Sequence, residues 1–152
     1  MNVEVVDFAA PDAPESFTRS LRTTGFAVLV NHPLPQELVQ QIYDEWLAFF
    51  QTDAKQQYRF SDGDQDGYFG PDVSETAKGN TVKDIKEFFH VYPWNRYPDE
   101  VSDAALRYRS IAVAIAQTLL RWVQDESPTE VAARFSRPLD EMVDERSRTL
   151  LR

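Results

Sequence analysis

Apolar residues recur with the period of an α-helix in three parts of the chain. Between positions 36 and 50 they follow i, i+4 spacing with polar residues opposite, which predicts an amphipathic helix packed on a core. A second pattern, opening at Asp99 and reaching Trp122, predicts a long helix. A third opens at Asp12 and is expected to end at Gly25, because glycine often closes a helix in the left-handed conformation.

Three other segments have the patterns of strands. Residues 3–8 predict a short first strand, and the continuous apolar run Phe26–Val30 predicts a strand buried on both faces. Ile85–Tyr92 predicts a strand with two different faces. Residues 53–79 carry few apolar side chains and many turn formers, so we expect an irregular loop with a short helix near 54–57.

Composition narrows the class of protein. The chain has 152 residues, 42% of them apolar and 12% aromatic, enough for one domain with a core. A net charge of −9 disfavours nucleic acid and anionic membrane surfaces as partners. The chain has no cysteine, no signal-peptide pattern at its start and no apolar run of membrane-spanning length. We therefore expect a cytoplasmic protein.

The two histidines lack the spacing of an iron site. A facial triad uses two histidines and a carboxylate, usually as His-x-Asp/Glu with a distant second histidine. Here Leu34 and Tyr92 stand two residues after His32 and His90. Structural roles are favoured: His32 orients its proline-rich turn, and His90 lies among aromatic residues where it could line a cavity.

An acidic motif resembles the start of a calcium loop. Asp62, Asp64, Asp66 and Gly67 have the D-x-D-x-D-G pattern of an EF-hand. That loop needs a glutamate at its twelfth position, and Val73 stands there instead. A solvated acidic turn is the favoured interpretation, and a calcium-responsive domain is the last-ranked hypothesis.

The predicted strand near the middle of the chain has two faces that differ in character. Alternation puts four residues on each side: Ile85, Glu87, Phe89 and Val91 on one, and Lys86, Phe88, His90 and Tyr92 on the other. Three charged residues lie on or beside this strand: Asp84, Lys86 and Glu87. They either include a buried pair that orients a site or prevent an edge strand from pairing with another chain. If the preceding loop folds over a pocket, its expected ligand contacts are Arg59, Tyr68, Phe69 and Lys78, and a plain surface loop is the alternative.

Five short motifs occur in order between residues 3 and 92: Val5-Val6-Asp7; Gly25-Phe26 with Val30-Asn31-His32-Pro33-Leu34-Pro35; Phe49-Phe50 with Lys55; Gly67-Tyr68; and Asp84-x-Lys86-Glu87-x-Phe89. Together they resemble the N-terminal region of non-haem iron(II), 2-oxoglutarate-dependent dioxygenases of the isopenicillin N synthase-like type. The helix to Trp122 and the terminal segment 149–152 extend the resemblance to the whole chain. Pro33 departs from the glycine usual at that position.

The resemblance implies an α+β fold, residues 1–152 being the N-terminal helix and strand region of a jelly-roll oxygenase. The catalytic barrel strands are then largely absent, with the jelly-roll core expected to start near 149. It also implies an intact enzyme that uses Fe(II) and 2-oxoglutarate to oxidise a small-molecule substrate. The family's iron ligands and 2-oxoglutarate-binding Arg-x-Ser follow the matched region, so this chain is expected to hold no metal and to be inactive alone. Tyr68, Lys78 and Phe89 are the predicted substrate contacts.

Two further expectations concern partners. The chain should join a C-terminal catalytic half or another subunit. Its origin as a truncated, a proteolysed or a natural fragment is left open. Leu47, Phe50 and Trp122 should then leave apolar surface exposed and promote self-association. The alternative is a non-catalytic α+β protein-interaction module that presents an aromatic-rich face to a protein partner.

Overall fold

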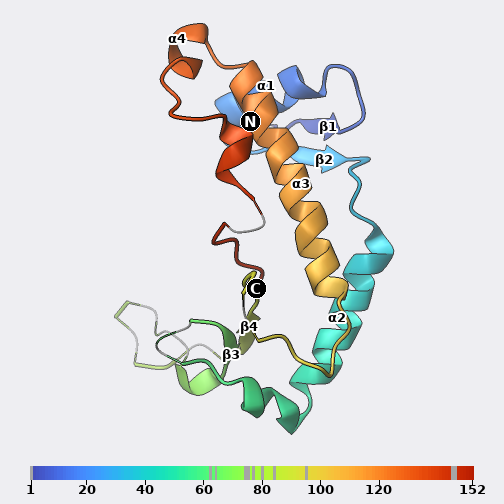
Figure 1. Cartoon of the computed structure of the whole chain (residues 1–152), viewed down its shortest axis with the longest axis vertical. Helices are drawn as coiled ribbons and strands as arrows, with labels where there is room; N and C mark the ends of the chain where they lie inside the picture. The colour runs from blue at the N-terminus through green and yellow to red at the C-terminus, as the bar shows by residue number, and fades with distance from the viewer. Residues whose placement is uncertain are drawn as a thin grey trace. The chain divides into compact units, whose positions relative to one another are not determined.

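The computed structural model describes residues 2–152 except 62, 64, 74, 75, 77, 80, 84, 95, 145 and 146 (Figure 1). The chain divides into two compact units, each with its own core. The first joins Met1–Pro35 to Tyr108–Ser147, and the second joins Gln36–Arg107 to Arg148–Arg152.

The helices and strands follow one another along the chain. Their order is β1 (Val5–Asp7), α1 (Ala13–Thr24), β2 (Val28–Val30), α2 (Gln36–Phe50), η1 (Asp53–Tyr58), β3 (Gly67–Phe69), η2 (Pro71–Val73), β4 (Phe88–His90), α3 (Ala104–Asp125), α4 (Thr129–Ala132) and η3 (Leu139–Met142), where η marks a 3₁₀ helix. The architecture is α+β, with two separate two-stranded sheets. Within the described residues, no helix has the length and apolar character needed to cross a bilayer.

The first unit has a small core beneath a parallel sheet. β1 pairs with β2 in the register Val5↔Val28, and the two strands run side by side in Figure 1. Val6, Ala13 and Phe17 form the buried core. The Trp122 ring of α3 lies with its centroid 5.9 Å from that of Phe17. Trp122 thus packs inside its own unit, contrary to the expectation that it is exposed.

Two motifs of the first unit meet at the ends of the parallel strands. Asn31 has a left-handed backbone with φ of 55°, and its side-chain amide donates to Asp7 Oδ2 at 2.9 Å. The Leu34 N–H donates to His32 Nδ1 at 3.3 Å, which confirms that His32 orients this turn. Gly25 ends α1 with φ of 79°, as predicted. Asp7, the last residue of β1, therefore holds the turn that follows β2.

The continuous apolar run predicted a strand buried on both faces, but only one face of β2 packs on the core. Ala27 and Leu29 pack on the core, whereas Phe26 and Val28 are 71% and 49% exposed. Val5 of β1 is 66% exposed on the same sheet. One face of this sheet is therefore open in the described structure, whereas parallel sheets are normally covered on both faces.

The second unit is built around an aromatic cluster. Its buried members are Phe49, Tyr68, Phe89, Val91 and Val101, with Trp46, Phe50, Ala54, Tyr58, Tyr97 and Leu151 packed against them. α2 directs its apolar side into this cluster, which confirms the predicted amphipathic helix. Phe50 packs here instead of being exposed, whereas Leu47 is 62% exposed, as expected.

The long helix α3 begins at Ala104 rather than near Asp99 as predicted. The Ala104 N–H donates to Ser102 Oγ at 3.2 Å, and the Ser102 hydroxyl donates to the carboxylate of Glu45 at 2.7 Å. The start of α3 therefore depends on a tertiary contact with α2. The local sequence around Asp99 does not reveal that contact.

Candidate functional site

The β3–β4 pair carries most of the residues that the sequence singled out. The strands are antiparallel with Tyr68 opposite Phe89 and Phe69 opposite Phe88. β3 lies within the stretch predicted as an irregular loop, and Ile85, predicted in the strand, lies outside β4 and is 98% exposed. Because side chains alternate along a strand, the pair has a core face with Tyr68 and Phe89 and an opposite, outer face.

Tyr68 lies on the core face and is 2% exposed. Its hydroxyl donates to Glu87 Oε2 at 2.6 Å, and the Lys55 ammonium lies 2.9 Å from that oxygen. Lys55 also donates to the Phe50 carbonyl at the end of α2. The Glu87 carboxylate, which directly precedes β4, thus binds groups of β3 and η1, and Lys55 links it to the end of α2.

This network shifts the proton affinities of its members. Burial, and then the hydrogen bond to Glu87, raises the pKa of Tyr68 to about 12. Burial acts to raise the pKa of Glu87, but the hydrogen bonds from Tyr68 and Lys55 outweigh it and hold that pKa below its usual value. At neutral pH the tyrosine is therefore neutral and the glutamate is ionised.

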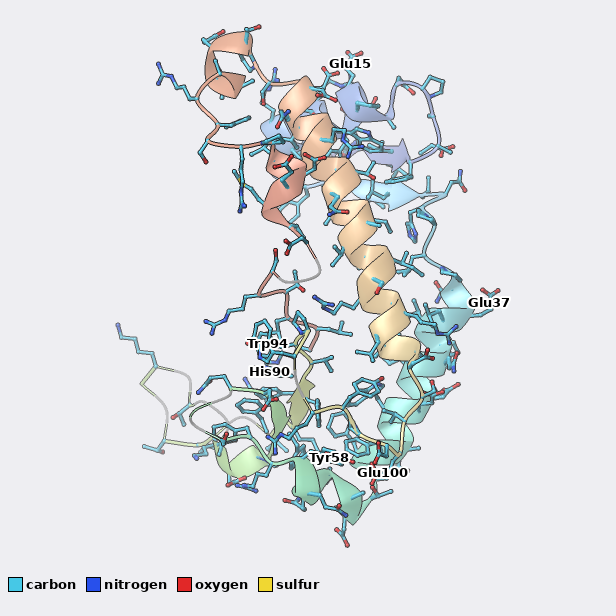
Figure 2. The ribbon with its side chains drawn as sticks, viewed as in Figure 1. Glu15, Glu37, Tyr58, His90, Trp94 and Glu100 are labelled. Atoms are coloured by element: carbon cyan, nitrogen blue, oxygen red, sulfur yellow. The ribbon has the colours of Figure 1, made fainter. Side chains whose placement is uncertain are left out.

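Phe89 lies in the centre of the aromatic cluster. Its ring centroid is 5.1 Å from that of Trp46, 6.1 Å from Phe49 and 6.2 Å from Tyr58. The Tyr58 hydroxyl donates to Glu100 Oε2 at 3.0 Å, and both residues are labelled in Figure 2. Phe89 thus contributes to the core that holds the hairpin in place.

The outer face of the pair carries a column of rings. Phe60 and Phe69 stack with centroids 4.4 Å apart and planes 15° apart, and Phe69 stacks on Phe88 at 4.8 Å and 11°. The His90 ring lies 4.4 Å from Phe69 and 5.0 Å from Phe88. These residues confirm the predicted alternation of faces and place His90 among aromatic side chains.

His90 is half-buried in this column. Its Nδ1 lies 3.2 Å from the Gln65 carbonyl oxygen, which only accepts, so Nδ1 carries the proton of the neutral ring. Burial lowers the pKa of His90, the contact with Gln65 opposes that effect, and the charge of Arg152 adds to it. The imidazole is therefore neutral at neutral pH.

The segment 148–152 forms a third edge beside β4. The Leu151 N–H donates to the Val91 carbonyl at 3.0 Å and the Val91 N–H donates back at 2.9 Å. Leu151 packs on the aromatic core, and the Arg152 guanidinium lies 3.7 Å from the centre of the Phe88 ring. This isolated bridge pairs the end of the chain with the residue that follows β4.

The acidic motif is described only in part, since Asp62 and Asp64 lie outside the described residues. Asp66 is buried, and its Oδ1 lies 3.1 Å from Arg96 Nη2. This carboxylate is therefore already bound to a cation of the protein. Calcium binding by the motif stays a hypothesis, and the ion pair of Asp66 with Arg96 does not favour it.

The three predicted substrate contacts are found in different surroundings. Tyr68 and Phe89 share the core face of the hairpin, whereas Lys78 lies in an exposed turn. Of the charged residues beside the strand, Glu87 has the orienting contacts described above, and Asp84 lies outside the described residues. Substrate contact by Tyr68, Lys78 or Phe89 stays a prediction.

Two relationships escaped sequence reasoning. Lys55 and Glu87 were recognised in separate motifs, but their ion pair was not expected. Arg152 was placed in a terminal segment without a partner. Covariation of paired positions would have indicated the first, but a single sequence carries no such signal.

The described residues do not form an iron site. No three histidine, cysteine, aspartate or glutamate side chains in that part of the chain come together as a metal would require. Iron(II) therefore does not fit the described residues, and we derive no chemical step through it.

Comparison with known proteins defines the class. The family model described as "non-haem dioxygenase in morphine synthesis N-terminal" matches residues 3–112. The chain belongs to this family, the N-terminal region of the non-haem iron(II)- and 2-oxoglutarate-dependent dioxygenases.

Particular relatives agree with this class. A candidate oxygenase from Shewanella oneidensis, known from a crystal structure, is 45% identical, with a TM-score of 0.83 over 93% of this chain. A candidate 2OG-Fe(II) oxygenase family protein from Caulobacter crescentus is 25% identical, with a TM-score of 0.63 over 81% of this chain. Gibberellin 2-beta-dioxygenase of Phaseolus coccineus is 36% identical over 66 residues, or 43% of this chain.

The chain spans only part of each relative. It covers 49% of the Shewanella protein, 48% of the Caulobacter protein and 20% of the gibberellin dioxygenase. Homology therefore establishes the family of this region and leaves the activity of a whole enzyme to be proposed.

Proposed function

We propose that this chain is the N-terminal α+β part of an iron(II)- and 2-oxoglutarate-dependent oxygenase that oxidises a small-molecule substrate. The jelly-roll core of that enzyme starts near residue 149 and is supplied by a C-terminal catalytic half or another subunit. Iron(II) and 2-oxoglutarate would be held by that catalytic half, where they would supply the oxidising chemistry. Within that enzyme, Tyr68, Lys78 and Phe89 belong to the hairpin and the preceding loop that line or close the substrate pocket.

The open face of the β1–β2 sheet is the observation that carries this proposal. A two-stranded sheet is marginal by itself in water, and a parallel one is normally covered on both faces. Val5 and Val28 lie opposite each other in the register and both are exposed. An apolar surface of this kind indicates a partner, and family membership indicates an oxygenase core as that partner.

The core face of the hairpin supplies rigidity to such a pocket. Glu87 fixes the Tyr68 hydroxyl and the Lys55 ammonium, so β3 cannot shift along β4 without breaking the contact between Tyr68 and Glu87. Catalytic sites need walls held to within about half an ångström. These residues are therefore positioning groups in the proposed enzyme.

The proposal is tested by comparing two proteins under identical conditions. One is this 152-residue chain, and the other is the product of the native gene read without interruption past the codon for Arg152. With iron(II), oxygen and 2-oxoglutarate, the longer product is expected to form succinate and this chain is not. Its added sequence should contain His-x-Asp within a few dozen residues.

Two results would contradict the proposal. One is a native gene that stops at Arg152 with no companion subunit, which would favour the interaction module. The other is a longer product that binds iron(II) but fails to consume 2-oxoglutarate in the presence of candidate substrates.

A further inference from the structure

The register of the bridge between Val91 and Leu151 places Arg152 on the outer face of the hairpin. In an antiparallel pair, directly opposite residues point to the same side of the sheet. Since Leu151 lies opposite Val91 on the core face, Arg152 lies opposite His90 and Leu150 opposite Tyr92. We call this surface the aromatic face: Phe69, Phe88, His90, Tyr92, Leu150 and Arg152.

The cation on this face has an aromatic support. The Arg152 guanidinium caps the column of Phe60, Phe69 and Phe88 rings at 3.7 Å from the Phe88 centroid. A guanidinium stacked on a ring keeps its N–H donors in its own plane, where they match the two oxygens of a carboxylate. The contact with Phe88 thus limits the positions that the Arg152 guanidinium can take.

The nearby carboxylates are engaged elsewhere. Glu87 on the core face is bound to Tyr68 and Lys55, and Asp66 is bound to Arg96. In the portion of the chain that is described, no acidic side chain forms an ion pair with Arg152. In a chain of net charge −9, this exposed arginine is complementary to an anion supplied from outside.

A second aromatic element continues the same row of positions. Tyr92 stacks on Trp94 with centroids 5.2 Å apart and planes 5° apart, and Trp94 is 54% exposed. Both His90 and Trp94 are labelled beside β4 in Figure 2. Residues two apart in a strand are separated by about 7 Å, so Tyr92 lies about that far from the position opposite Arg152. An exposed indole already in parallel stacking favours another planar ring.

We propose that the substrate of this oxygenase is an aromatic carboxylic acid bound on the aromatic face. Its carboxylate pairs with the Arg152 guanidinium, and its ring packs against Tyr92 and Trp94. The neutral imidazole of His90 lies between these two contacts and adds no charge. This assignment rests on the proposed function for the reaction, but the binding that it requires does not depend on turnover.

The probe is 2-naphthoate, a rigid planar aromatic carboxylate, titrated into the chain by calorimetry without iron or 2-oxoglutarate. Three comparison ligands separate the contributions. They are 2-naphthamide, which lacks the charge; decahydro-2-naphthoate, which lacks the planar ring; and 2-oxoglutarate, which is an aliphatic dicarboxylate. Each is expected to bind at least about tenfold more weakly, the usual scale for a lost charge-assisted contact.

Matched variants locate the site. Arg152→Gln should weaken 2-naphthoate binding at least about tenfold, and Trp94→Ala should weaken it severalfold. Arg148→Gln removes the same charge from an exposed position in the same segment and should leave binding unchanged. Circular dichroism confirms that each variant is folded.

The outcomes distinguish this assignment from the proposed function. Equal binding of 2-naphthoate and its amide, equal binding by the wild type and Arg152→Gln, or no binding by the wild type would overturn it. Failure of the longer gene product to consume 2-oxoglutarate would contradict the reaction while leaving the binding result standing. Equally tight binding of 2-oxoglutarate would show that the face selects charge and not aromaticity, which also contradicts the assignment.

Discussion

The hydroxyl of Tyr68 lies 2.6 Å from Glu87 Oε2, and this contact joins β3 to the residue that precedes β4. Tyr68 is almost completely buried, whereas Glu87 is partly exposed. The hydrogen bond therefore has an ionised acceptor and a donor that water does not reach, a combination stronger than a neutral pair.

Tyr68→Phe removes this donor and leaves the ring in place. We expect the free energy of unfolding to fall by about 1–2 kcal/mol, the scale for a hydrogen bond to a charged group that water partly replaces. Urea denaturation followed by near-ultraviolet circular dichroism measures this change. Tyr43→Phe is the control, because Tyr43 is 68% exposed, and an equal loss there would contradict the role of the buried bond.

The same contact predicts a pH dependence at the alkaline end. Folding raises the pKa of Tyr68 from 10 to about 12, so the folded state holds this proton more tightly than the unfolded state. Its contribution is constant below pH 10 and is lost as pH rises from 10 towards 12. The stability difference between the wild type and Tyr68→Phe should therefore shrink between pH 8 and pH 11, and a constant difference would refute this account.

Gly67 permits the close approach of β3 to η1. Its φ is 89°, and a Cβ there would come closer than 3.0 Å to the carbonyl oxygen of Tyr58. Gly25 has a similar φ of 79° but open space around it. We expect Gly25→Ala to cost about 1 kcal/mol from backbone strain alone, and Gly67→Ala to cost at least about 2 kcal/mol more. Thermal denaturation of both variants checks this, and equal losses would show that the steric contact is relieved.

Sequence reasoning succeeded where local periodicity determines structure. The helix at positions 36–50 and the glycine that ends α1 follow from spacing and backbone preference. β3 was missed because three residues are too few for a period, and its formation depends on pairing with β4 about twenty residues later.

The burial of β2 was misjudged for a different reason. A continuous apolar run indicates that both faces are meant to be covered, but it does not say whether the cover belongs to the same chain. Phe26 and Val28 are exposed in the described structure. At the candidate site, the alternating faces of β4 were predictable, whereas the positions of Lys55 and Arg152 depend on tertiary contacts.

Removing the buried carboxylate of Asp66 should reduce the stability of the protein more than removing an exposed carboxylate. Asp66→Asn should lower the free energy of unfolding by about 1–3 kcal/mol, because a buried carboxylate is lost from its cation. Glu4→Gln removes a carboxylate from the exposed pair with Arg19, and such surface pairs contribute little. Urea denaturation of both variants should show the larger loss for Asp66→Asn, and the reverse order would contradict it.

The open sheet face predicts that the isolated chain self-associates. Val5→Thr with Val28→Thr makes that face polar while keeping β-branched side chains. Light scattering at increasing protein concentration should show association of the wild type and its reduction in the double variant. Val131→Thr, at an exposed position outside the sheet, should not change it. A wild type that stays monomeric throughout would argue against a missing partner at this face.

His90 predicts a loss of stability on acidification. Burial, and further the charge of Arg152, lowers the pKa of His90 below its usual value of 6.5, so the unfolded state takes up the proton first. This contribution is complete above pH 6.5 and is lost as pH falls through the lower folded-state pKa. The His90 imidazole, followed by proton NMR, should titrate below pH 6.5 in the wild type and at higher pH in Arg152→Gln. Since Arg148→Gln removes a charge that is not among the causes of this shift, an equal change there would show that Arg152 does not act at close range.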